Sequence, residues 1–407
     1  MSFLEKRNEL RPSSGEAPFD VGEVFFSRTD ERGVVKSGNY VFRRVAHYDW
    51  DELEGAPHKL IRHPDMPRAV FWLLWETIKA GRPVGAYVKN RAKDGLHYWV
   101  YAVIAPIEGG YLSARIKPTS PMLATVEDLY ADLRRRENDE RLDPGKSAEE
   151  LLDRIRDLGF PSYEGFSTHA LAEELIARDV LLDTTVSGRT HAMNRTLQHA
   201  EQLKIESEAL AADFNAMATV PHNLRVIASR IEATGGPIST LSKNYGSMSR
   251  DMSDWFEANV IGENSNFAGI KTSVTTSLFI HGMSRILVEC DRQLEFERRK
   301  LGHLDIDEER TILRSLVAHY TDKAASARDH VLDESRRILA ACEKMDRHVL
   351  GLSTTRVMCK IESARSTTAG DSLGDIIAQL KVFQDRISAR LDQIIRLGRE
   401  IQDSLGN

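Results

Sequence analysis

Residues 53–67 read LEGAPHKLIRHPDMP, and this stretch carries the most specific local pattern of the 407-residue chain. Pro64 and Pro67 each fix a backbone dihedral and cannot donate a hydrogen bond, so they mark a rigid turn. Apolar residues then recur every three to four positions over residues 68–79, as on one face of a helix. From spacing alone, the stretch predicts a rigid turn in which Asp65 caps the following helix.

Short β-like runs alternate with turn residues on both sides of this stretch. Two of them flank an Asp-Glu-Arg-Gly turn and two flank a Lys-Asp-Gly turn, which indicates hairpins. The expected strands cover residues 23–28, 34–36, 84–90, 97–105 and 111–117. With the helix at 68–79 they predict an α+β domain, in which an antiparallel sheet carries short helices on one face and a single ligand fits between the layers.

Aromatic and proline residues are concentrated in the first third of the chain. Sixteen of the 29 aromatic residues and nine of the 13 prolines lie at or before residue 121, and none of the prolines follows Pro237. Because proline disrupts helices, the rest of the chain is free to be almost continuously helical. We therefore expect a polar N-terminal tail at 1–19, the α+β domain at 20–120, a helical connector at 121–185 and an all-α bundle or coiled coil at 186–404. The connector is either a relay between the modules or an inert spacer.

Apolar residues in the rear module follow three long seams with 3-4 spacing, which is typical of coiled coils and helical bundles. The seams are Met283, Leu287, Cys290, Leu294, Leu301 and Leu304, interrupted by Glu297; Val331, Ile338, Cys342, Met345, Val349 and Leu352; and Ile376, Leu380, Phe383, Ile387, Ile394 and Ile401. The sequence RVIASRIEA at 225–233 is echoed by RVMCKIESA at 356–364. This echo predicts two tandem helical hairpins, and so a four-helix bundle from one chain, unless it reflects convergent amphipathic helices.

Composition excludes several classes of protein. A net charge of −6 with 29% charged residues gives no reason to expect nucleic-acid binding. The longest apolar runs are too short to cross a bilayer, the N-terminus lacks the apolar core of a signal peptide, and three cysteines are too few for a disulfide framework or a zinc site. No nucleophile motif, phosphate loop or paired-histidine metal motif is present. We expect a cytoplasmic protein that is not an enzyme.

The RHPDMP string resembles the PAS domain of bacterial aerotaxis (energy-taxis) receptors. The strings VKNR at 88–91 and HYWV at 97–100 are similar to the same family, as is NYVF at 39–42, where the first helix of that domain opens. The resemblance covers residues 20–135. It implies a PAS fold whose pocket holds FAD non-covalently, with the flavin reporting oxygen and electron-transport status.

By matching positions, the resemblance implies that Asn39, Arg62, His63, Asp65 and Trp75 contact the flavin. Arg62 offers a planar fork of donors for the pyrophosphate, and Trp75 a flat face near the ring system. Asn39 and His63 can donate or accept as the flavin gains a proton, and Asp65 would hold the preceding loop against the ligand by capping the next helix. Without a cofactor, Trp75 would be an ordinary core residue.

The resemblance implies a redox or oxygen sensor that signals through the helical bundle in chemotaxis or aerotaxis. The segment IESAR at 361–365 loosely resembles the hairpin tip of chemotaxis-receptor signalling domains, which implies a chemotaxis histidine kinase or its coupling protein as partner. The string that follows this tip in those receptors is missing here. The alternatives are a ligand-free PAS scaffold or interaction protein and a haem-binding PAS sensor. A homodimer through the PAS domain and a monomeric pseudo-dimeric bundle both stay open.

Overall fold

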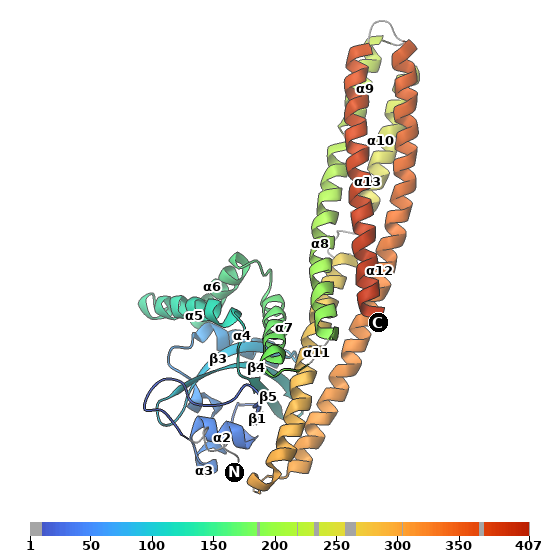
Figure 1. Cartoon of the computed structure of the whole chain (residues 1–407). Helices are drawn as coiled ribbons and strands as arrows, with labels where there is room; N and C mark the ends of the chain where they lie inside the picture. Colours follow the sequence, from blue (N-terminus) through green and yellow to red (C-terminus); the bar gives the residue numbers. More distant parts are fainter. Residues whose placement is uncertain are drawn as a thin grey trace. The chain divides into compact units, whose positions relative to one another are not determined.

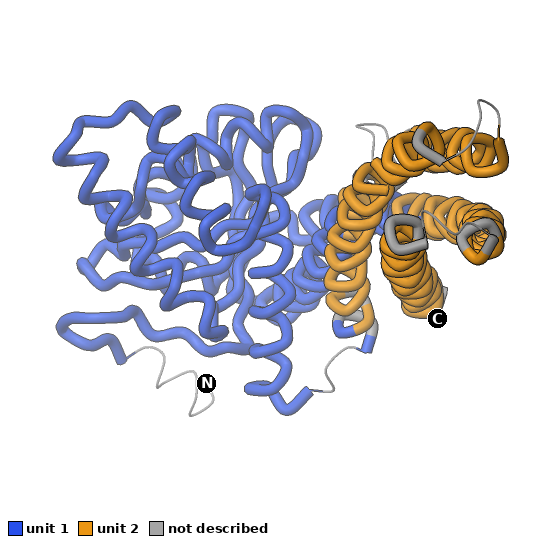
Figure 2. The backbone as a smooth tube through the Cα atoms, turned by 90° about the horizontal axis from the view of Figure 1, so that it is seen from above, with its two compact units in different colours: residues 1–191, 275–325 blue, residues 192–274, 326–407 orange. Residues whose placement is uncertain are grey.

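The computed structural model describes residues 10–184, 188–217, 219–231, 236–256, 266–302, 304–365 and 370–406. The chain divides into two compact units, coloured separately in Figure 2. Unit 1 comprises residues 1–191 and 275–325, and unit 2 comprises residues 192–274 and 326–407. This division differs from the expected domain boundaries, because residues 275–325 belong with the front module instead of the bundle.

Unit 1 is built around a five-stranded antiparallel sheet with the strand order β2-β1-β5-β4-β3 (Figure 1). The strands are β1 (Phe25–Asp30), β2 (Val35–Gly38), β3 (Val84–Arg91), β4 (His97–Ile107) and β5 (Gly110–Ile116). Both predicted hairpins are present, with Ser27 opposite Gly38 and Val88 opposite Val100. The predicted α+β fold followed by a helical region is therefore confirmed.

Successive side chains of each strand point to opposite faces of this sheet. We call the face with Thr29, Ala102 and Arg115 the inner face and the face with Arg28 and Tyr101 the outer face. Four short helical elements belong to the inner face: α2 (Tyr40–Ala46), α3 (Trp50–Leu53), the 3-10 helix η1 (His58–Ile61) and α4 (Arg68–Lys79). The bounds of α4 are those predicted from its apolar spacing, because Ala69, Val70, Leu74 and Ile78 form its buried face.

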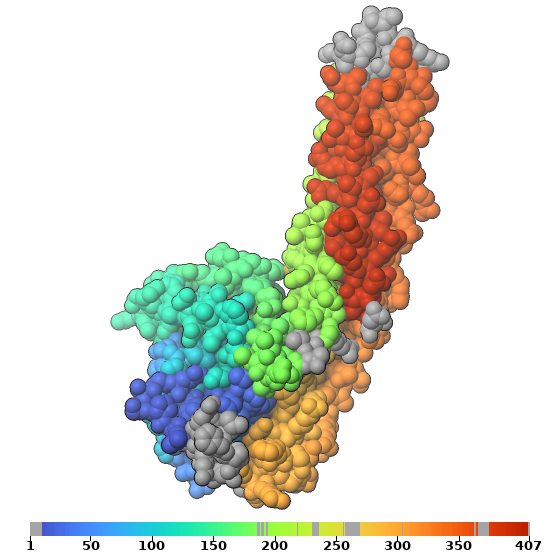
Figure 3. Space-filling view, in the orientation of Figure 1, coloured from blue at the N-terminus to red at the C-terminus, as the bar shows by residue number. Residues whose placement is uncertain are grey.

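The expected connector is part of the unit 1 core. Its helices are α5 (Met122–Asp139), α6 (Pro144–Asp157) and α7 (Tyr163–Leu181), and α5 and α6 form part of the surface of unit 1 in Figure 3. On the outer face, Tyr87 Oη donates to Glu174 Oε1 of α7 at 2.7 Å. Helix α7 begins at Tyr163, because the Ser162 side chain accepts from Gly165 N as its N-cap.

Two long helices of the rear module also pack in unit 1: the end of α11 (Asn266–Glu297) and the start of α12 (Ile306–Arg365). Cys290 Sγ donates to Phe25 O at 3.6 Å, and Arg28 pairs with Glu309 at 2.7 Å. The residues of the first seam from Met283 to Leu301 are buried, but they belong to the same core as the sheet. The seam thus predicted burial correctly, but its residues share their core with the sheet of unit 1 instead of lying in a separate bundle.

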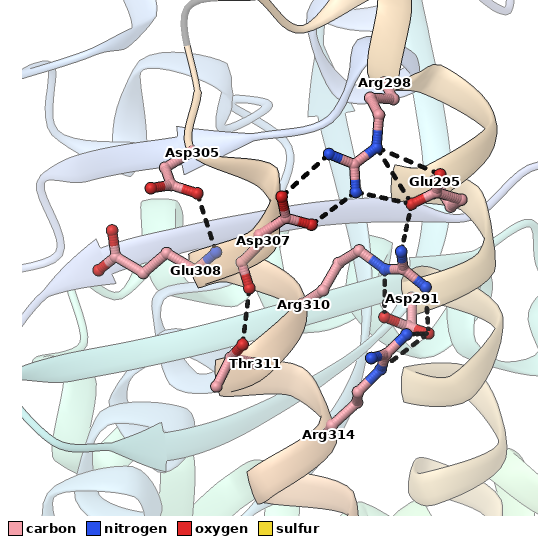
Figure 4. Close-up of polar contacts among 9 residues, drawn as sticks. All are labelled: Asp291, Glu295, Arg298, Asp305, Asp307, Glu308, Arg310, Thr311 and Arg314. Carbon is pink, nitrogen blue, oxygen red and sulfur yellow. Dashed lines mark hydrogen bonds and ion pairs between the residues drawn. The ribbon is translucent and has the colours of Figure 1, made fainter.

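An ion-pair network links α11 to α12 across the short 3-10 helix η3 (Arg298–Lys300), as Figure 4 shows. Arg298 pairs with Glu295 at 2.8 Å and with Asp307 at 2.6 Å. Arg310 pairs with Asp291 at 2.7 Å. These pairs hold the end of α11 against the start of α12, so the chain reverses between the two helices.

The polar N-terminal tail is shorter than the expected 1–19, of which residues 1–9 lie outside the described part. Ala17 N donates to His97 O at 2.7 Å, and His97 N donates to Gly15 O at 3.1 Å. Ala17 and Phe19 are buried. These two apolar side chains hold the segment against the sheet, so the tail ends before residue 15.

Almost all described residues of unit 2 are helical. It contains most of α8 (Gly188–Met217), then α9 (Val220–Ile231), α10 (Pro237–Phe256), the remaining parts of α11 and α12, and α13 (Gly370–Gly406). The residues of the second and third seams form part of its core. All of these seam residues are buried except Phe383, which is partly buried. Helices α12 and α13 lie side by side (Figures 1 and 3), and Ser335 Oγ donates to Gly398 O at 2.9 Å.

The two echoed segments each end a helix of unit 2: α9 stops at Ile231 and α12 stops at Arg365. Residues 232–235 and 366–369, which follow these two helix ends, lie outside the described part of the chain. None of the helices within the described ranges is long and apolar enough to span a lipid bilayer.

Candidate functional site

A cavity of about 280 Å³ lies between the inner face of the sheet and the helices η1 and α4. Its walls combine aromatic, apolar and cationic side chains, and no Asp or Glu is among the lining residues. The lining residues are Thr29, Arg32, Gly33, Pro57, His58, Lys59, Arg62, Phe71, Leu74, Trp75, Ile78, Val88, Asn90, Ala102, Ile104, Tyr111, Ser113 and Arg115. A ligand here would meet flat apolar walls under a positive potential.

One aromatic pair and one cation–π pair line the cavity. Trp75 of α4 meets Tyr111 of β5 edge-to-face, with the ring centroids 5.5 Å apart. The Arg62 guanidinium stacks on the Phe71 ring at 3.8 Å from its centroid, and its Nη2 donates to Met66 O at 3.5 Å. Burial lowers the pKa of Arg62, although the group keeps its charge at neutral pH. The charged Arg62 guanidinium can therefore donate hydrogen bonds to a ligand that lies beside the flat Phe71 ring.

Arg115 lies deeper, on the inner face of β5, and is only 3% exposed. Its Nη2 donates to Ser27 Oγ at 2.7 Å and lies 2.7 Å from His58 Nε2. Its Nη1 is buried and has no hydrogen-bond partner within the described residues. Burial is the main reason that the pKa of Arg115 falls to about 10, so the guanidinium is still charged at neutral pH.

His58 faces Arg115 as a neutral base. Burial first, and the Arg115 charge second, lower the pKa of His58 to about 3. Its Nε2 must therefore carry a lone pair that accepts from Arg115 Nη2, which places the ring proton on Nδ1. The ring also stacks parallel to Phe42 of α2, with centroids 6.0 Å apart.

Of the five residues that the family resemblance implied, Arg62 and Trp75 line the cavity. Asn39 does not line it, because all of its polar atoms serve the backbone. Its Oδ1 accepts from Phe26 N at 2.9 Å and from Phe42 N at 3.2 Å, and its Nδ2 donates to Val24 O at 2.8 Å. Asn39 is thus the N-cap of α2 and the tie between that helix and β1.

His63 and Asp65 also lie outside the cavity lining. Asp65 is exposed and pairs with Lys89 of β3 at 3.0 Å. His63 Nδ1 accepts from Asp65 N at 3.2 Å. The expectation that Asp65 caps α4 is wrong: the N-cap position is Pro67, with no side-chain capping bond, because the Asp65 carboxylate is drawn to the Lys89 ammonium instead.

Sequence reasoning missed Arg115, His58 and Tyr111, and it quoted Asn90 only within the VKNR string. A usable signal was present in β5. The period of two places Arg115 on the same face as Tyr111 and Ser113, and a lone cation facing a core is rare enough to mark a ligand or an ion pair.

A second depression on the surface is lined by Arg11, Tyr40, Arg43, Arg44, His47, Tyr48, Asp49, Lys93 and Asp94. Its cations already have carboxylate partners, such as Asp94 for Arg11 and Glu52 for Lys93. It is therefore the weaker candidate. No group of acidic, histidine and cysteine side chains in the described residues is arranged to hold a metal ion.

Comparison with known proteins agrees with this architecture. The family model of the PAS fold matches residues 37–112. The aerotaxis receptor of Escherichia coli (strain K12) is 42% identical over 127 residues, which make up 30% of this chain and 25% of the receptor. The chain thus spans about a quarter of the length of this curated relative. Unit 1 therefore contains a PAS domain, and that domain is similar to the aerotaxis receptor over the matched region.

Proposed function

We propose that this protein is a cytoplasmic redox or oxygen sensor of the aerotaxis type, which binds FAD non-covalently in the PAS cavity and is not an enzyme. The observation that carries the proposal is the cavity itself, with aromatic walls, several cations and no carboxylate in its lining. This chemistry suits a flat ring with hydrogen-bond acceptors on its edge that is joined to a phosphate-bearing chain. The similarity to an aerotaxis receptor over the same residues supports the choice of a flavin.

The residues present fit such a cofactor. The cavity volume of about 280 Å³ is near the lower end for ligand sites, so it suits the ring system and leaves the dinucleotide chain at the mouth. There Arg62, with Lys59 and Arg32, would hold the pyrophosphate, and Trp75 would pack near the ring. When bound, the flavin supplies reversible electron transfer coupled to protonation, which side chains lack.

A contiguous set of contacts leads from the cavity to α11 within unit 1. The Arg115 guanidinium lies over Phe42 of α2 at 5.5 Å from the ring centroid. At the start of α2, Tyr40 N donates to Glu297 Oε2 of α11 at 2.7 Å. A change of charge in the cavity would act on Phe42 and α2, and so on α11, whose chain continues into unit 2. We propose this path as the first step of the signal.

The flavin proposal is tested by the absorption spectrum of the purified full chain, with and without added FAD. We expect a flavin spectrum in the wild type, and loss of flavin in Trp75→Ala and Arg62→Ala while the helical circular dichroism is kept. Trp72→Ala is the matched control, because Trp72 is on the same helix but 40% exposed and outside the lining. A colourless protein that ignores FAD would refute the proposal.

A haem spectrum would support the second candidate. The geometry disfavours it, because His58 is the only histidine in the cavity lining and its Nε2 accepts from Arg115. An axial ligand would have to give up that bond.

For the output, we propose a chemotaxis histidine kinase or its coupling protein as partner. The test is co-precipitation of both proteins with the full chain, with the flavin oxidised and then reduced. Retention that depends on the redox state supports this branch, and no retention in either state removes it. Light scattering on the same samples tells a PAS-mediated homodimer from a monomer.

A further inference from the structure

Arg115 is a buried cation that no carboxylate of the described residues neutralises. Its hydrogen-bond partners are Ser27 Oγ and His58 Nε2, both neutral, and both meet the same nitrogen, Nη2. The other terminal nitrogen, Nη1, is buried without a partner. Because fully buried charges in proteins are paired as a rule, this arrangement leaves one strong donor and one positive charge to be satisfied.

The titratable groups around Arg115 do not supply the missing negative charge. The acidic groups that interact electrostatically with Arg115 are the Tyr98 hydroxyl and the Cys290 thiol. Burial raises the pKa of both groups well above neutrality, so both stay protonated. His58 is neutral as well. The remaining charged residues of the cavity lining, Arg32, Lys59 and Arg62, have the same sign as Arg115. No group of the described residues therefore supplies the compensating charge, and an anionic ligand in the cavity could supply it.

We propose that Arg115 is the counter-charge of the bound cofactor: its free Nη1 donates to the electron-rich pyrimidine edge of the flavin ring and favours the reduced, negatively charged ring over the oxidised one. This inference rests on the proposed flavin function. When bound, the flavin would accept two electrons from a reductant, dithionite in the test below, and one proton from water, so that one negative charge would remain for Arg115 to balance. Arg115 keeps its own proton throughout and acts by charge.

His58 is a positioning residue in this arrangement. By accepting from Nη2 together with Ser27, it fixes the guanidinium plane and leaves Nη1 as the unused donor. A protonated histidine in this place would repel Arg115, and the low pKa of His58 prevents that. Arg115 and His58 thus present one charged hydrogen-bond donor with a fixed direction. The donor is buried, and electrostatic interactions are stronger in a buried site than in water.

The decisive experiment is a dithionite titration of the FAD-loaded full chain against reference dyes. In Arg115→Gln we expect the preference for reduced over oxidised flavin to fall at least about tenfold, because a charged hydrogen bond exceeds a neutral one by roughly 1.4 kcal/mol. Tenfold corresponds to a midpoint potential about 30 mV lower for two electrons. The midpoint potential of Arg115→Lys, which keeps the charge, should fall between those of the wild type and Arg115→Gln. Arg135→Gln is the matched control, since its side chain is 65% exposed and the same charge is lost outside the cavity lining.

A second measurement uses the wild type alone and does not depend on a variant folding. The potential is followed against pH for bound and for free FAD. At a certain pH, the number of protons that the flavin takes up on reduction changes from two to one. Arg115 should make that pH lower for bound FAD than for free FAD. An unmoved change point, or a potential in Arg115→Gln equal to those of the wild type and Arg135→Gln, overturns the inference while leaving flavin binding intact. A wild type that takes up no FAD refutes the proposed function and, with it, this inference.

Discussion

Glu297 offers a sharp test of how α11 is attached to the PAS domain. The sequence shows it as the single polar interruption of an apolar seam, and the structure buries it to 2% exposure. Its Oε2 accepts from Tyr40 N at the start of α2, and Gln293 Nε2 donates to its Oε1 at 2.7 Å. Desolvation raises the pKa of Glu297 to about 7, outweighing these hydrogen bonds, and the charge of Glu23 adds to the rise.

The sign and size of the pH effect follow from that pKa. In the unfolded chain Glu297 returns to its ordinary pKa of 4.5, so between pH 4.5 and 7 the folded state holds more protons. Stability therefore falls as pH rises through this window, because the carboxyl must ionise in a buried place. A shift from 4.5 to about 7 corresponds to about 3 kcal/mol in full, of which about 2 to 3 kcal/mol develops between pH 5 and 8.

Glu297→Gln removes the titration and keeps the size of the side chain. Urea unfolding followed by tryptophan fluorescence reports mainly on unit 1, which holds every tryptophan except Trp255. The wild type should lose about 2 to 3 kcal/mol relative to Glu297→Gln between pH 5 and 8. Glu295→Gln is the control on the same helix: its partner Arg298 lowers the pKa of Glu295, so its contribution is constant in this range. Parallel curves for the wild type and Glu297→Gln would refute the buried contact.

Two further substitutions test the site. Asn39→Ala should destabilise unit 1 by about 2–4 kcal/mol, because it removes a helix cap and leaves backbone groups unsatisfied. Below its melting temperature the variant should keep the FAD affinity of the wild type. Loss of flavin from the folded variant would mean that Asn39 contacts the cofactor. Gly33→Ala should weaken FAD binding, measured by flavin fluorescence, because Gly33 has φ +76° and a Cβ there would lie 3.1 Å from the Trp75 ring. Gly109→Ala, at φ +72° with open space around it, should cost about 1–2 kcal/mol in strain and leave binding unchanged.

Local elements of the PAS domain were predictable because their signals are local. The Asp-Gly turn and the alternation around it define β3 and β4, and the apolar spacing between Pro67 and Gly81 defines α4 to its observed ends. The seams of the rear helices likewise predicted which faces are buried. In each case the deciding physics operates within a few residues of the chain.

What the sequence could not supply is the identity of the packing partner. The seam from Met283 to Leu301 has the same spacing whether it meets a helix or a sheet, and here it meets the sheet of unit 1. The same limit affected the site. Asn39 and Arg62 match the family pattern equally well, but the hydrogen bonds that bind Asn39 to β1 and α2 become visible only in three dimensions.

The central claim is that the cavity between the sheet and α4 holds a flavin. Ala102 lines this cavity from β4, and Ala114 is its matched control on the outer face. We predict that the wild-type full chain binds one equivalent of FAD, monitored by quenching of flavin fluorescence. Ala102→Leu, which fills the cavity, should bind none while melting at or above the wild-type temperature, and Ala114→Ser should bind as the wild type does. Equal FAD binding by the wild type and Ala102→Leu, or none by the wild type, would contradict the account.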